Sequence, residues 1–371
     1  MMIRAVIAAA VFLSLLSGCA EHPKVKPFFY AIDNPVRLSE WGLLDVRDGS
    51  LNLGQDVLPY SLNTPLFTDY AHKLRTIWMK EGPVEYNPTD ILDFPIGTVI
   101  SKTFYYPSTP DGVVKKTADL QPVTQQKGLA LANHHLIETR LLVHREAGWE
   151  PLSYVWNEDQ SDAKLTRIGD LKTLALKEAG RKTDFSYLVP NINQCAGCHA
   201  PNNTTRELKP IGPKARHLNG VYTYADGPMN QIDKWLEIGY LSAGPEHRPQ
   251  AAIWDDQDAS LETRARAYLD INCAHCHNPV GPADTSGLHL NPDNESQPHL
   301  GICKNAVAAG SGTGGRKYDI TPGEPDNSIF LYRMETRDPS AMMPELGRSL
   351  VHDEGVKLIA DWISDMAGGC E

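Results

Sequence analysis

The pentapeptide pattern C-x-x-C-H occurs twice, as Cys-Ala-Gly-Cys-His at 195–199 and as Cys-Ala-His-Cys-His at 273–277. This pattern is the attachment sequence of a c-type haem. The spacing suits that chemistry, because two thiols add covalently to the porphyrin vinyl groups and the adjoining imidazole then binds the iron. Two copies therefore predict two covalently bound haem c groups, and the rest of the chain must fold around them.

A zinc ribbon made from two C-x-x-C knuckles and a pair of thioredoxin-like redox motifs are the alternative interpretations. A zinc ribbon leaves both following histidines without a role, and a redox motif calls for a βαβ context that the sequence lacks. Haem attachment gives every one of these side chains a function. It assigns the thioethers to Cys195, Cys198, Cys273 and Cys276 and the axial iron ligands to His199 and His277.

Length, composition and charge limit the remaining functions. The chain has 371 residues, enough for two or three domains with hydrophobic cores, and its 41% hydrophobic and 22% charged content is that of a globular protein. The formal net charge of −11 argues against nucleic acid and against electrostatic adhesion to an anionic membrane. We therefore expect no nucleic-acid partner, whereas a cationic partner protein would be attracted.

The segment 1–18 has the pattern of an export signal. Arg4 supplies a positive charge, and the almost wholly apolar stretch 5–15 is too short to span a bilayer. Leu-Ser-Gly then leads into Cys19 as in a bacterial lipobox, which predicts cleavage before Cys19, acylation of this residue and anchorage to a lipid membrane. A plain secretory signal cut nearby is the alternative. Ala20 at the second mature position favours the outer membrane of a Gram-negative bacterium, so we expect a periplasm-facing lipoprotein of the cell envelope.

The cysteine usage agrees with this location. Lipid would take Cys19 and haem would take four thiols, which leaves Cys303 and Cys370. In an oxidising periplasm two remaining thiols most simply form a disulfide. Closing a loop of about 67 residues would remove on the order of 4 kcal/mol of unfolded-chain entropy and fix the end of the chain.

Hydrophobic patterning divides the mature chain into four parts. Residues 19–27 are polar, contain two prolines and are expected to form a tether. Short apolar runs broken by Pro, Gly, Asn and Asp at 28–188 predict an antiparallel β-sandwich with small helical insertions. The first haem segment, 189–258, and the second haem domain, 259–371, follow. The predicted fold class is thus α+β and multidomain, with a β-sandwich-like N-terminal domain followed by two mainly α-helical cytochrome c haem segments.

The expected β-rich domain shows no catalytic pattern. It contains no Ser-His-Asp spacing, nucleotide-binding glycine loop or carboxylate pair that stands out. Its histidines are interpreted as surface or hydrogen-bonded groups. A polar cluster consists of Tyr70, His72, Lys73 and Arg75. It is interpreted as a solvated strand edge rather than a substrate clamp.

The first haem segment has only the proximal side of its haem defined. Residues 191–194 precede the motif directly, without the amphipathic helix usual before a cytochrome c motif. Candidates for the sixth iron ligand are Met229, His217 and His247, and Met229 is favoured because it opens a helical apolar pattern at 229–238. An open site is the alternative. A five-coordinate haem binds small molecules or peroxide, whereas a six-coordinate one mainly passes electrons.

The second haem domain has the more complete plan of a class I cytochrome c. A helix is expected at 261–271, before the motif, and a closing amphipathic helix at 351–366. A carbonyl of the turn at 278–282 is expected to accept the hydrogen bond from Nδ1 of His277, which would fix the imidazole and raise its basicity.

A thioether ligand for the second haem is expected from Ala-Met-Met-Pro at 341–344. Met343 is favoured over Met342 because the following proline stiffens the loop and directs its neighbour. Both methionines could instead be packing residues. Neutral thioether ligation would favour the reduced iron and so raise the reduction potential.

With these residues identified, the chain resembles a family of bacterial diheme c-type cytochromes that has no assigned physiological role. The similarity spans nearly all of the mature chain and lies in 64–71, 94–100, 137–142, 154–157 and both motifs. The segment 321–328, with Arg333 and 343–344, is also similar to haem domains attached to periplasmic dehydrogenases. The resemblance implies electron transfer in the cell envelope and a β-rich N-terminal domain, and it names no substrate.

The resulting hypothesis is a lipid-anchored diheme c-type cytochrome that carries electrons to or from a periplasmic dehydrogenase or a terminal acceptor, which favours an electron-transfer protein over a self-sufficient enzyme. A rival hypothesis is a haem-dependent oxidoreductase or peroxidase in which the first haem is an open catalytic site. A third makes the β-rich domain a docking module for a membrane or secreted partner.

Overall fold

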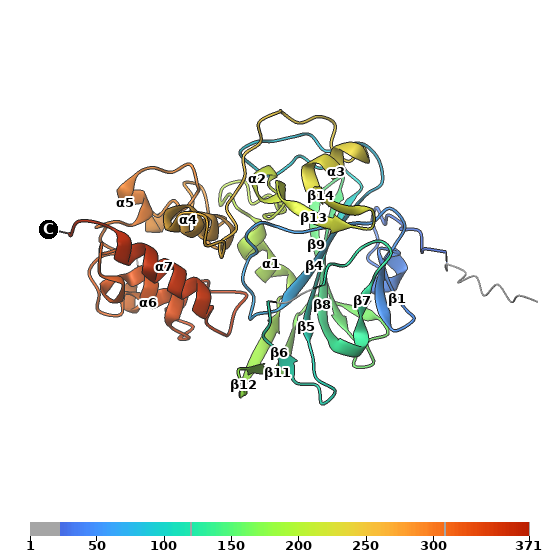
Figure 1. The fold of residues 1–371 in the computed structure, drawn as a ribbon, viewed down its shortest axis with the longest axis horizontal. Coiled ribbons are helices and arrows are strands. Elements are labelled where there is room, and N and C mark those ends of the chain that lie inside the picture. Colours follow the sequence, from blue (N-terminus) through green and yellow to red (C-terminus); the bar gives the residue numbers. More distant parts are fainter. Residues whose placement is uncertain (1–22, 119–120, 308, 371) are drawn as a thin grey trace, which may run out of the picture.

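The computed structural model describes residues 23–118, 121–307 and 309–370. The chain is an α+β protein with several antiparallel sheets in its N-terminal half and helices in its C-terminal part (Figure 1). The expected signal at 1–18 and the expected acylation site, Cys19, lie outside the described residues. In the described part of the chain, no helix has the length and apolar character that a membrane crossing requires.

The largest sheet has six antiparallel strands, rich in the β-branched and aromatic residues that favour strands. Their order across the sheet is β10 (Ala163–Thr166), β9 (Gly148–Trp156), β8 (His134–Arg145), β5 (Thr98–Pro107), β4 (His72–Met79) and β3 (Leu58–Tyr60). The hairpin expected between β8 and β9 is present, with Arg145 paired to Gly148 across a tight turn.

A three-stranded antiparallel sheet packs against one face of the large sheet. It contains β1 (Leu44–Arg47), β2 (Ser50–Leu53) and β7 (Leu129–Ala130), with the short 3-10 helices η1 (Leu38–Trp41) and η2 (Leu131–Asn133) before β1 and after β7. The buried side chains between the two sheets include Leu51 and Val143. Trp41 Nε1 donates to the Tyr154 hydroxyl at 2.8 Å, which satisfies the indole N–H inside this core.

Elements that adjoin the two C-x-x-C-H motifs lie on the other face of the large sheet. Ile77, Ile100 and Leu142 pack there against α2 (Ala215–Leu218) and α3 (Gln231–Glu237). The remaining strands are β13 (Val221–Tyr224), paired with β14 (Gly227–Asn230), and the sheet of β12 (Arg181–Val189), β11 (Asp170–Glu178) and β6 (Val114–Lys115), in which β6 runs parallel to β11.

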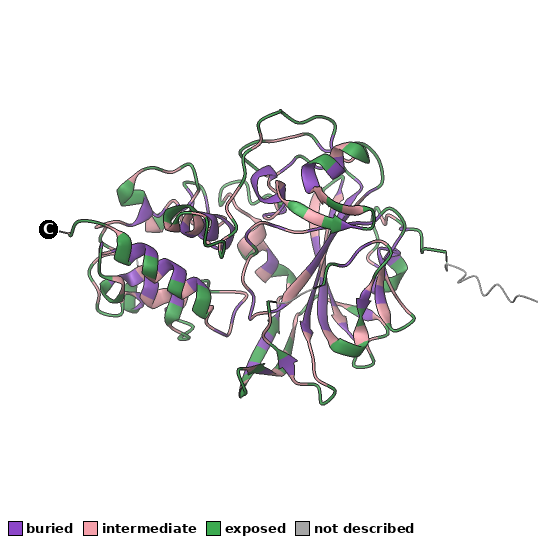
Figure 2. Ribbon diagram, in the orientation of Figure 1, coloured by how far each residue is buried: buried purple, intermediate pink, exposed green. Residues whose placement is uncertain are grey.

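The C-terminal part is built from short helices around one apolar cluster. Its elements are α4 (Leu261–Asn272), η3 (Asp284–Ser286), α5 (Gln297–Leu300), η4 (Gly310–Thr313), η5 (Pro325–Asn327), α6 (Ile329–Glu335) and α7 (Asp353–Asp365). α4 begins at Ser260, whose hydroxyl accepts from the Thr263 amide at 3.2 Å as an N-cap. Figure 2 shows buried positions recurring along α7, and Ile359 and Trp362 are among them. α4 and α7 agree with the helices expected at 261–271 and 351–366.

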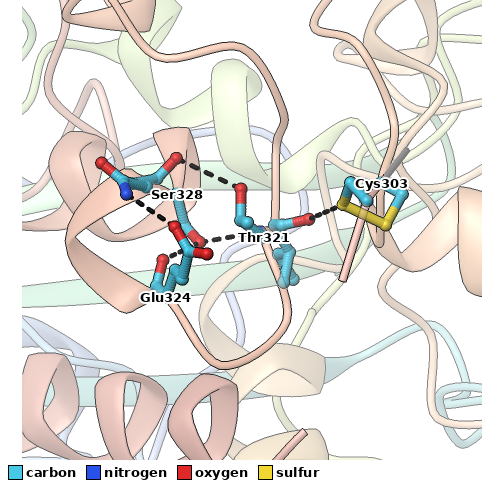
Figure 3. Close-up of a disulfide and its surroundings, with 7 residues drawn as sticks. Cys303, Thr321, Glu324 and Ser328 are labelled. Atoms are coloured by element: carbon cyan, nitrogen blue, oxygen red, sulfur yellow. Dashed lines mark hydrogen bonds between the residues drawn. A yellow bond between two sulfur atoms is a disulfide. The ribbon is translucent and has the colours of Figure 1, made fainter. Parts of the chain in front are cut away.

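The disulfide Cys303–Cys370 is present, with the two Cα atoms 5.2 Å apart (Figure 3). It ties the chain end to Cys303, whose amide donates to the Ile320 carbonyl at 2.9 Å. The loop beside it is held by Ser328, whose hydroxyl donates to the Glu324 carbonyl at 3.0 Å and accepts from the Thr321 amide at 2.9 Å. The last residues of the chain are thereby attached to the helical part.

The expected tether is not free at its C-terminal end. The Gln55 amide donates to the Val25 carbonyl at 2.8 Å, and Arg47 Nη1 donates to the Pro23 carbonyl at 3.0 Å. The chain passes so close to Gly42 that a Cβ there would lie 2.5 Å from the Lys26 carbonyl oxygen. Residues 23–27 therefore belong to the folded N-terminal half.

The two halves meet at the segment 64–71. The Phe67 amide donates to Asn272 Oδ1 at the end of α4 at 2.8 Å. Asp69 Oδ1 accepts from the amides of Ser349 and Leu350, each at 2.7 Å. A carboxylate with 2% exposure thus joins the sheet-bearing half to the helical half.

Candidate metal centre

The first motif lies in α1 (Ile192–His199). Asn191 and Gln194 form a capping box, in which each side chain accepts a hydrogen bond from the backbone amide of the other, at 2.9 and 3.0 Å. This local pattern starts the helix at Ile192, three residues before Cys195, so no separate helix precedes the motif. His199 Nδ1 donates to the Lys209 carbonyl at 2.8 Å, which leaves Nε2 free to bind a metal.

The second motif begins at the C-terminus of α4. His277 Nδ1 donates to the Ser286 hydroxyl at 3.1 Å, and this hydroxyl donates to the Ala283 carbonyl at 2.7 Å. The expectation of a carbonyl acceptor from the turn at 278–282 is therefore wrong. That turn closes on itself, because the Gly281 amide donates to the Asn278 carbonyl at 3.2 Å. The hydroxyl nevertheless performs the expected task of orienting the imidazole so that Nε2 can bind a metal.

A cavity of about 330 Å³ adjoins the second motif. Cys273, Cys276, His277 and Met343 all line it, so the structure brings these four predicted site residues together. The methionine loop is held in place by hydrogen bonds from the Met343 amide to the Arg333 carbonyl at 2.7 Å and from Arg348 Nε to the Met343 carbonyl at 3.0 Å. Met342 does not line this cavity.

The two motifs touch each other. The Cys276 thiol lies 3.6 Å from the Gly197 carbonyl oxygen, and both Gly197 and Cys198 line the cavity beside the second motif. Next to this contact, the Asn203 amide donates to the Val280 carbonyl at 2.6 Å. Segments separated by 79 positions in the chain therefore form one site.

Burial raises the pKa of all four thiols in the motifs. For Cys273 and Cys276 the value rises to about 12, with a neighbouring cysteine as the next cause. Thioredoxin-like motifs work through a thiol whose pKa is lowered. The arrangement therefore does not favour disulfide exchange.

A row of cations crosses the large sheet on the face that adjoins the first motif. The strand register places Arg75, Lys102 and Arg140 directly beside one another on β4, β5 and β8. Lys73 lies on the same face, opposite Phe104. Lys73, Lys102 and Arg140 surround this aromatic ring, with their charged groups 5.6, 5.2 and 4.3 Å from its centroid. Like charges directly opposite each other destabilise a sheet, so this row carries a cost.

The row has too few counter-ions. Glu138, which is fully buried, accepts from Arg140 Nε at 2.8 Å and from the Tyr187 hydroxyl at 2.8 Å. Asp69 acts on Lys73 electrostatically, although its oxygens are hydrogen-bonded to the helical half. Within the described residues, Arg75 and Lys102 form no ion pair. Four basic side chains thus face two carboxylates, a formal excess of two, and burial together with the neighbouring cations lowers the pKa of Lys73 well below 10.5.

This charge excess changes the interpretation of the cluster at 70–75. Arg75 is only 8% exposed, so the expectation of a solvated strand edge is wrong. Because β3 covers the outer side of β4, β4 is an inner strand. Burial, and then the charges of Arg140 and Arg75, lower the pKa of Lys102 from 10.5 to about 7.

The cations act on the first motif. Burial lowers the pKa of His199 to about 3, and Lys102 is the next cause. Burial raises the pKa of the Cys198 thiol, and Arg140 and Lys102 oppose that rise. The row therefore lies within electrostatic range of the group that α1 would hold.

Two of the predicted sixth ligands lie away from the motifs. Met229 is in β14, paired with Tyr222, and packs in the apolar cluster around Trp235. The helix expected from Met229 begins only at Gln231, because Asn230 caps it by accepting from the Ile232 amide. His247 is exposed. Neither residue lines the cavity beside the motifs.

The third candidate, His217, is fully buried in an ion cluster. Its Nε2 lies 2.9 Å from Asp270 Oδ2. Asp270 also accepts from Arg216 Nε at 2.6 Å and from Lys214 Nζ at 3.0 Å. This cluster joins α2 to α4, so His217 has a structural partner at the nitrogen that usually binds iron.

Comparisons with known proteins give no assignment. No protein-family model, curated protein or solved structure matches the chain. In the residues that the structure describes, no group of three or more His, Cys, Asp or Glu side chains is placed to hold a metal ion. The function is therefore argued from the motifs and their surroundings.

Proposed function

We propose that the chain is a lipid-anchored diheme c-type cytochrome that carries electrons in the bacterial cell envelope. The single observation that carries this proposal is that the two C-x-x-C-H motifs, far apart in sequence, meet beside one cavity. When bound, each haem would supply an iron that changes between the ferrous and ferric states. The protein would supply attachment, axial ligands and electrostatic surroundings.

The residues fit two such groups. All four cysteines of the motifs are free of disulfides, and both following histidines use Nδ1 in hydrogen bonds that leave Nε2 free. Met343 lines the cavity of the second motif and would be its thioether ligand. The four basic side chains beside the first motif face only two carboxylates, and the two propionates of a haem there would supply the missing counter-ions. A haem there would neutralise an otherwise costly row of cations.

Contact between the motifs supports electron transfer between the two groups. The thiol of Cys276 would become a thioether of the second haem, and it touches the backbone of the first motif. An electron could then pass between the haems through packed protein atoms rather than through solvent. In this proposal, residues 259–371 form a class I cytochrome c-like domain, and residues 28–188 form a β-sandwich-like domain that covers the first haem.

The proposed location and partner follow from charge and redox chemistry. A disulfide between Cys303 and Cys370 suits an oxidising compartment such as the periplasm. Acylation of Cys19 would hold the protein at a membrane. The net charge of −11 favours a redox partner with a cationic docking face, either a dehydrogenase or a terminal acceptor.

Haem counting tests the proposal. The full-length chain is expressed in a host with c-type cytochrome maturation, and haem is counted by pyridine haemochrome and intact mass. We expect two covalent haems, and one haem in each of the double variants C195A/C198A and C273A/C276A. C303A/C370A is the matched control and keeps two. A haem-free chain that instead carries zinc would refute the proposal, and a high-spin first haem that reacts with peroxide would favour the enzyme alternative.

A further inference from the structure

The haem expected at the first motif has no second axial ligand among the residues that sequence reasoning favoured. Met229 packs in an apolar cluster, His217 is bound to Asp270 and His247 is exposed. The contact between the motifs turns attention to the second motif itself. Its middle residue is His275, and C-x-x-C-H chemistry gives this position no task.

The His275 side chain has an unused nitrogen. Its Nδ1 is buried, and among the described residues the Ile271 backbone is the one hydrogen-bonding group that acts on the ring. This leaves Nε2 as the nitrogen that can bind a metal, as in His199 and His277. Imidazole is the commonest metal ligand in proteins, and iron would give this side chain a partner.

His275 also differs in direction from the ligands of its own haem. The amides of Cys276 and His277 both donate to the Cys273 carbonyl, which makes the motif a helical turn. Residues three or four positions apart on such a turn share a face, whereas neighbours one or two positions apart do not. Cys273 therefore shares a side of the turn with Cys276 and with His277, whereas His275 is one or two positions from each of them and lines the same cavity from a different side of the turn.

The His275 side chain lies near the first motif. His275 lines the cavity together with Gly197 and Cys198. It is close enough to His199 for its charge to act on that imidazole. The two rings belong to different motifs, and the contact between Cys276 and Gly197 holds those motifs together.

We propose that His275 is the second axial ligand of the haem attached at Cys195 and Cys198, with His199 as the first. This inference rests on the proposed function. The first haem would then have two imidazole ligands, while the second would have His277 and the thioether of Met343. Because thioether ligation raises the reduction potential, the first haem would have the lower potential. Electrons would flow from the first haem to the second.

Spectroscopy of the full-length holoprotein tests this assignment. In the unaltered protein we expect two low-spin ferric haems by EPR, one of them with the g-values of bis-imidazole ligation. In H275A we expect one high-spin haem per chain, and added imidazole restores the low-spin signal. In H275M the first haem stays low-spin, and its potential rises toward that of the second. M229L is the matched control and leaves both spectra unchanged.

The outcomes separate the two proposals. If the chain attaches no haem, the proposed function fails and no ligand question arises. If H275A attaches two haems and both remain low-spin, the assignment of His275 is overturned and the proposed function stands. Loss of the low-spin signal in K102M, with H275A unchanged, would identify Lys102 as the ligand instead. Pyridine haemochrome and the far-ultraviolet circular dichroism of each variant show that any change comes from ligation and not from loss of fold or haem.

Discussion

The hydroxyl of Ser286 is the only described group that holds Nδ1 of His277, the proximal ligand expected for the second haem. A hydrogen bond at this position makes the imidazole more basic and favours the ferric state. In Ser286→Ala we expect the potential of the second haem to rise by roughly 40 mV, the equivalent of one hydrogen bond of about 1 kcal/mol. Redox titration measures the shift. Ser286→Thr keeps the hydroxyl and should keep the potential, and an equal shift in both variants would contradict the argument.

The neighbouring methionines allow a matched pair of variants. Met343 lines the cavity beside the second motif and Met342 does not. Met343→Ala should abolish the far-red band of thioether-ligated ferric haem and lower the potential of the second haem by more than about 100 mV, because the thioether favours reduced iron. Met342→Ala should keep the band. Loss of the band in Met342→Ala alone would reverse the assignment.

The strands β4, β5 and β8 place the cationic row where its charges would act on the reduction potential of the first haem. Its members come from three neighbouring strands, and removing one charge should make the ferric state of the first haem easier to reach. We expect Lys102→Gln to lower the potential of that haem by on the order of 50 mV. Lys164→Gln, an exposed position on β10, is the control and should leave the potential unchanged. A rise in potential in Lys102→Gln would show that the charge does not act on the iron.

The same row predicts a pH dependence for the protein made without haem. The pKa of Lys102 is about 7 in the fold and 10.5 in the unfolded chain. Between these values the unfolded chain binds more protons, so the free energy of unfolding should increase as the pH rises from 7 to 10. Urea denaturation of haem-free protein, with Lys102→Met for comparison, measures this increase. The variant should show a smaller slope, and equal slopes would rule out Lys102 as the cause.

Local patterns in the sequence were enough to predict several elements. The helices at 261–272 and 353–365 and the hairpin of β8 and β9 follow from periodicity and turn residues that lie within one segment. The helix expected from Met229 failed for a local reason as well, since Asn230 is a stronger start signal than the apolar pattern.

Parts of the site depend on contacts that no local pattern contains. The cationic row exists only because the register aligns Arg75, Lys102 and Arg140, and register between strands is a property of the sheet. The two motifs, their cysteines and their histidines were predictable because C-x-x-C-H is contiguous. His275 could be read from the sequence as a second histidine inside the second motif. Its proximity to the first motif, however, comes from the packing of the two halves. The acceptor for His277 lies nine positions away, beyond the turn that was expected to supply it.

At the scale of the whole molecule, Asp69 joins the two halves. Its buried carboxylate accepts from the amides of Ser349 and Leu350, and hydrogen bonds to a charged group contribute about 1.5–3 kcal/mol each. Asp69→Ala should therefore reduce the free energy of unfolding by about 3 kcal/mol and make the segment at 345–352 more sensitive to protease. Urea denaturation and limited proteolysis measure these effects. Asp255→Ala, at an exposed turn, should change neither. Unchanged stability and protease sensitivity in Asp69→Ala would show that the halves are joined by other contacts.

The docked segment at 23–27 would set the orientation of the protein at a membrane if Cys19 is acylated. If Cys19 carries lipid, only three residues lie between it and Pro23, and the four residue steps span at most about 14 Å. Pro23 is bonded to Arg47 on β1, and Figure 1 shows β1 on the side of the molecule away from α4 to α7. The bilayer would therefore face the β1–β2 end, and the second haem would point outward into the aqueous compartment. A partner that diffuses in the periplasm would reach the second haem first, while one embedded in the same membrane would meet the β-rich end.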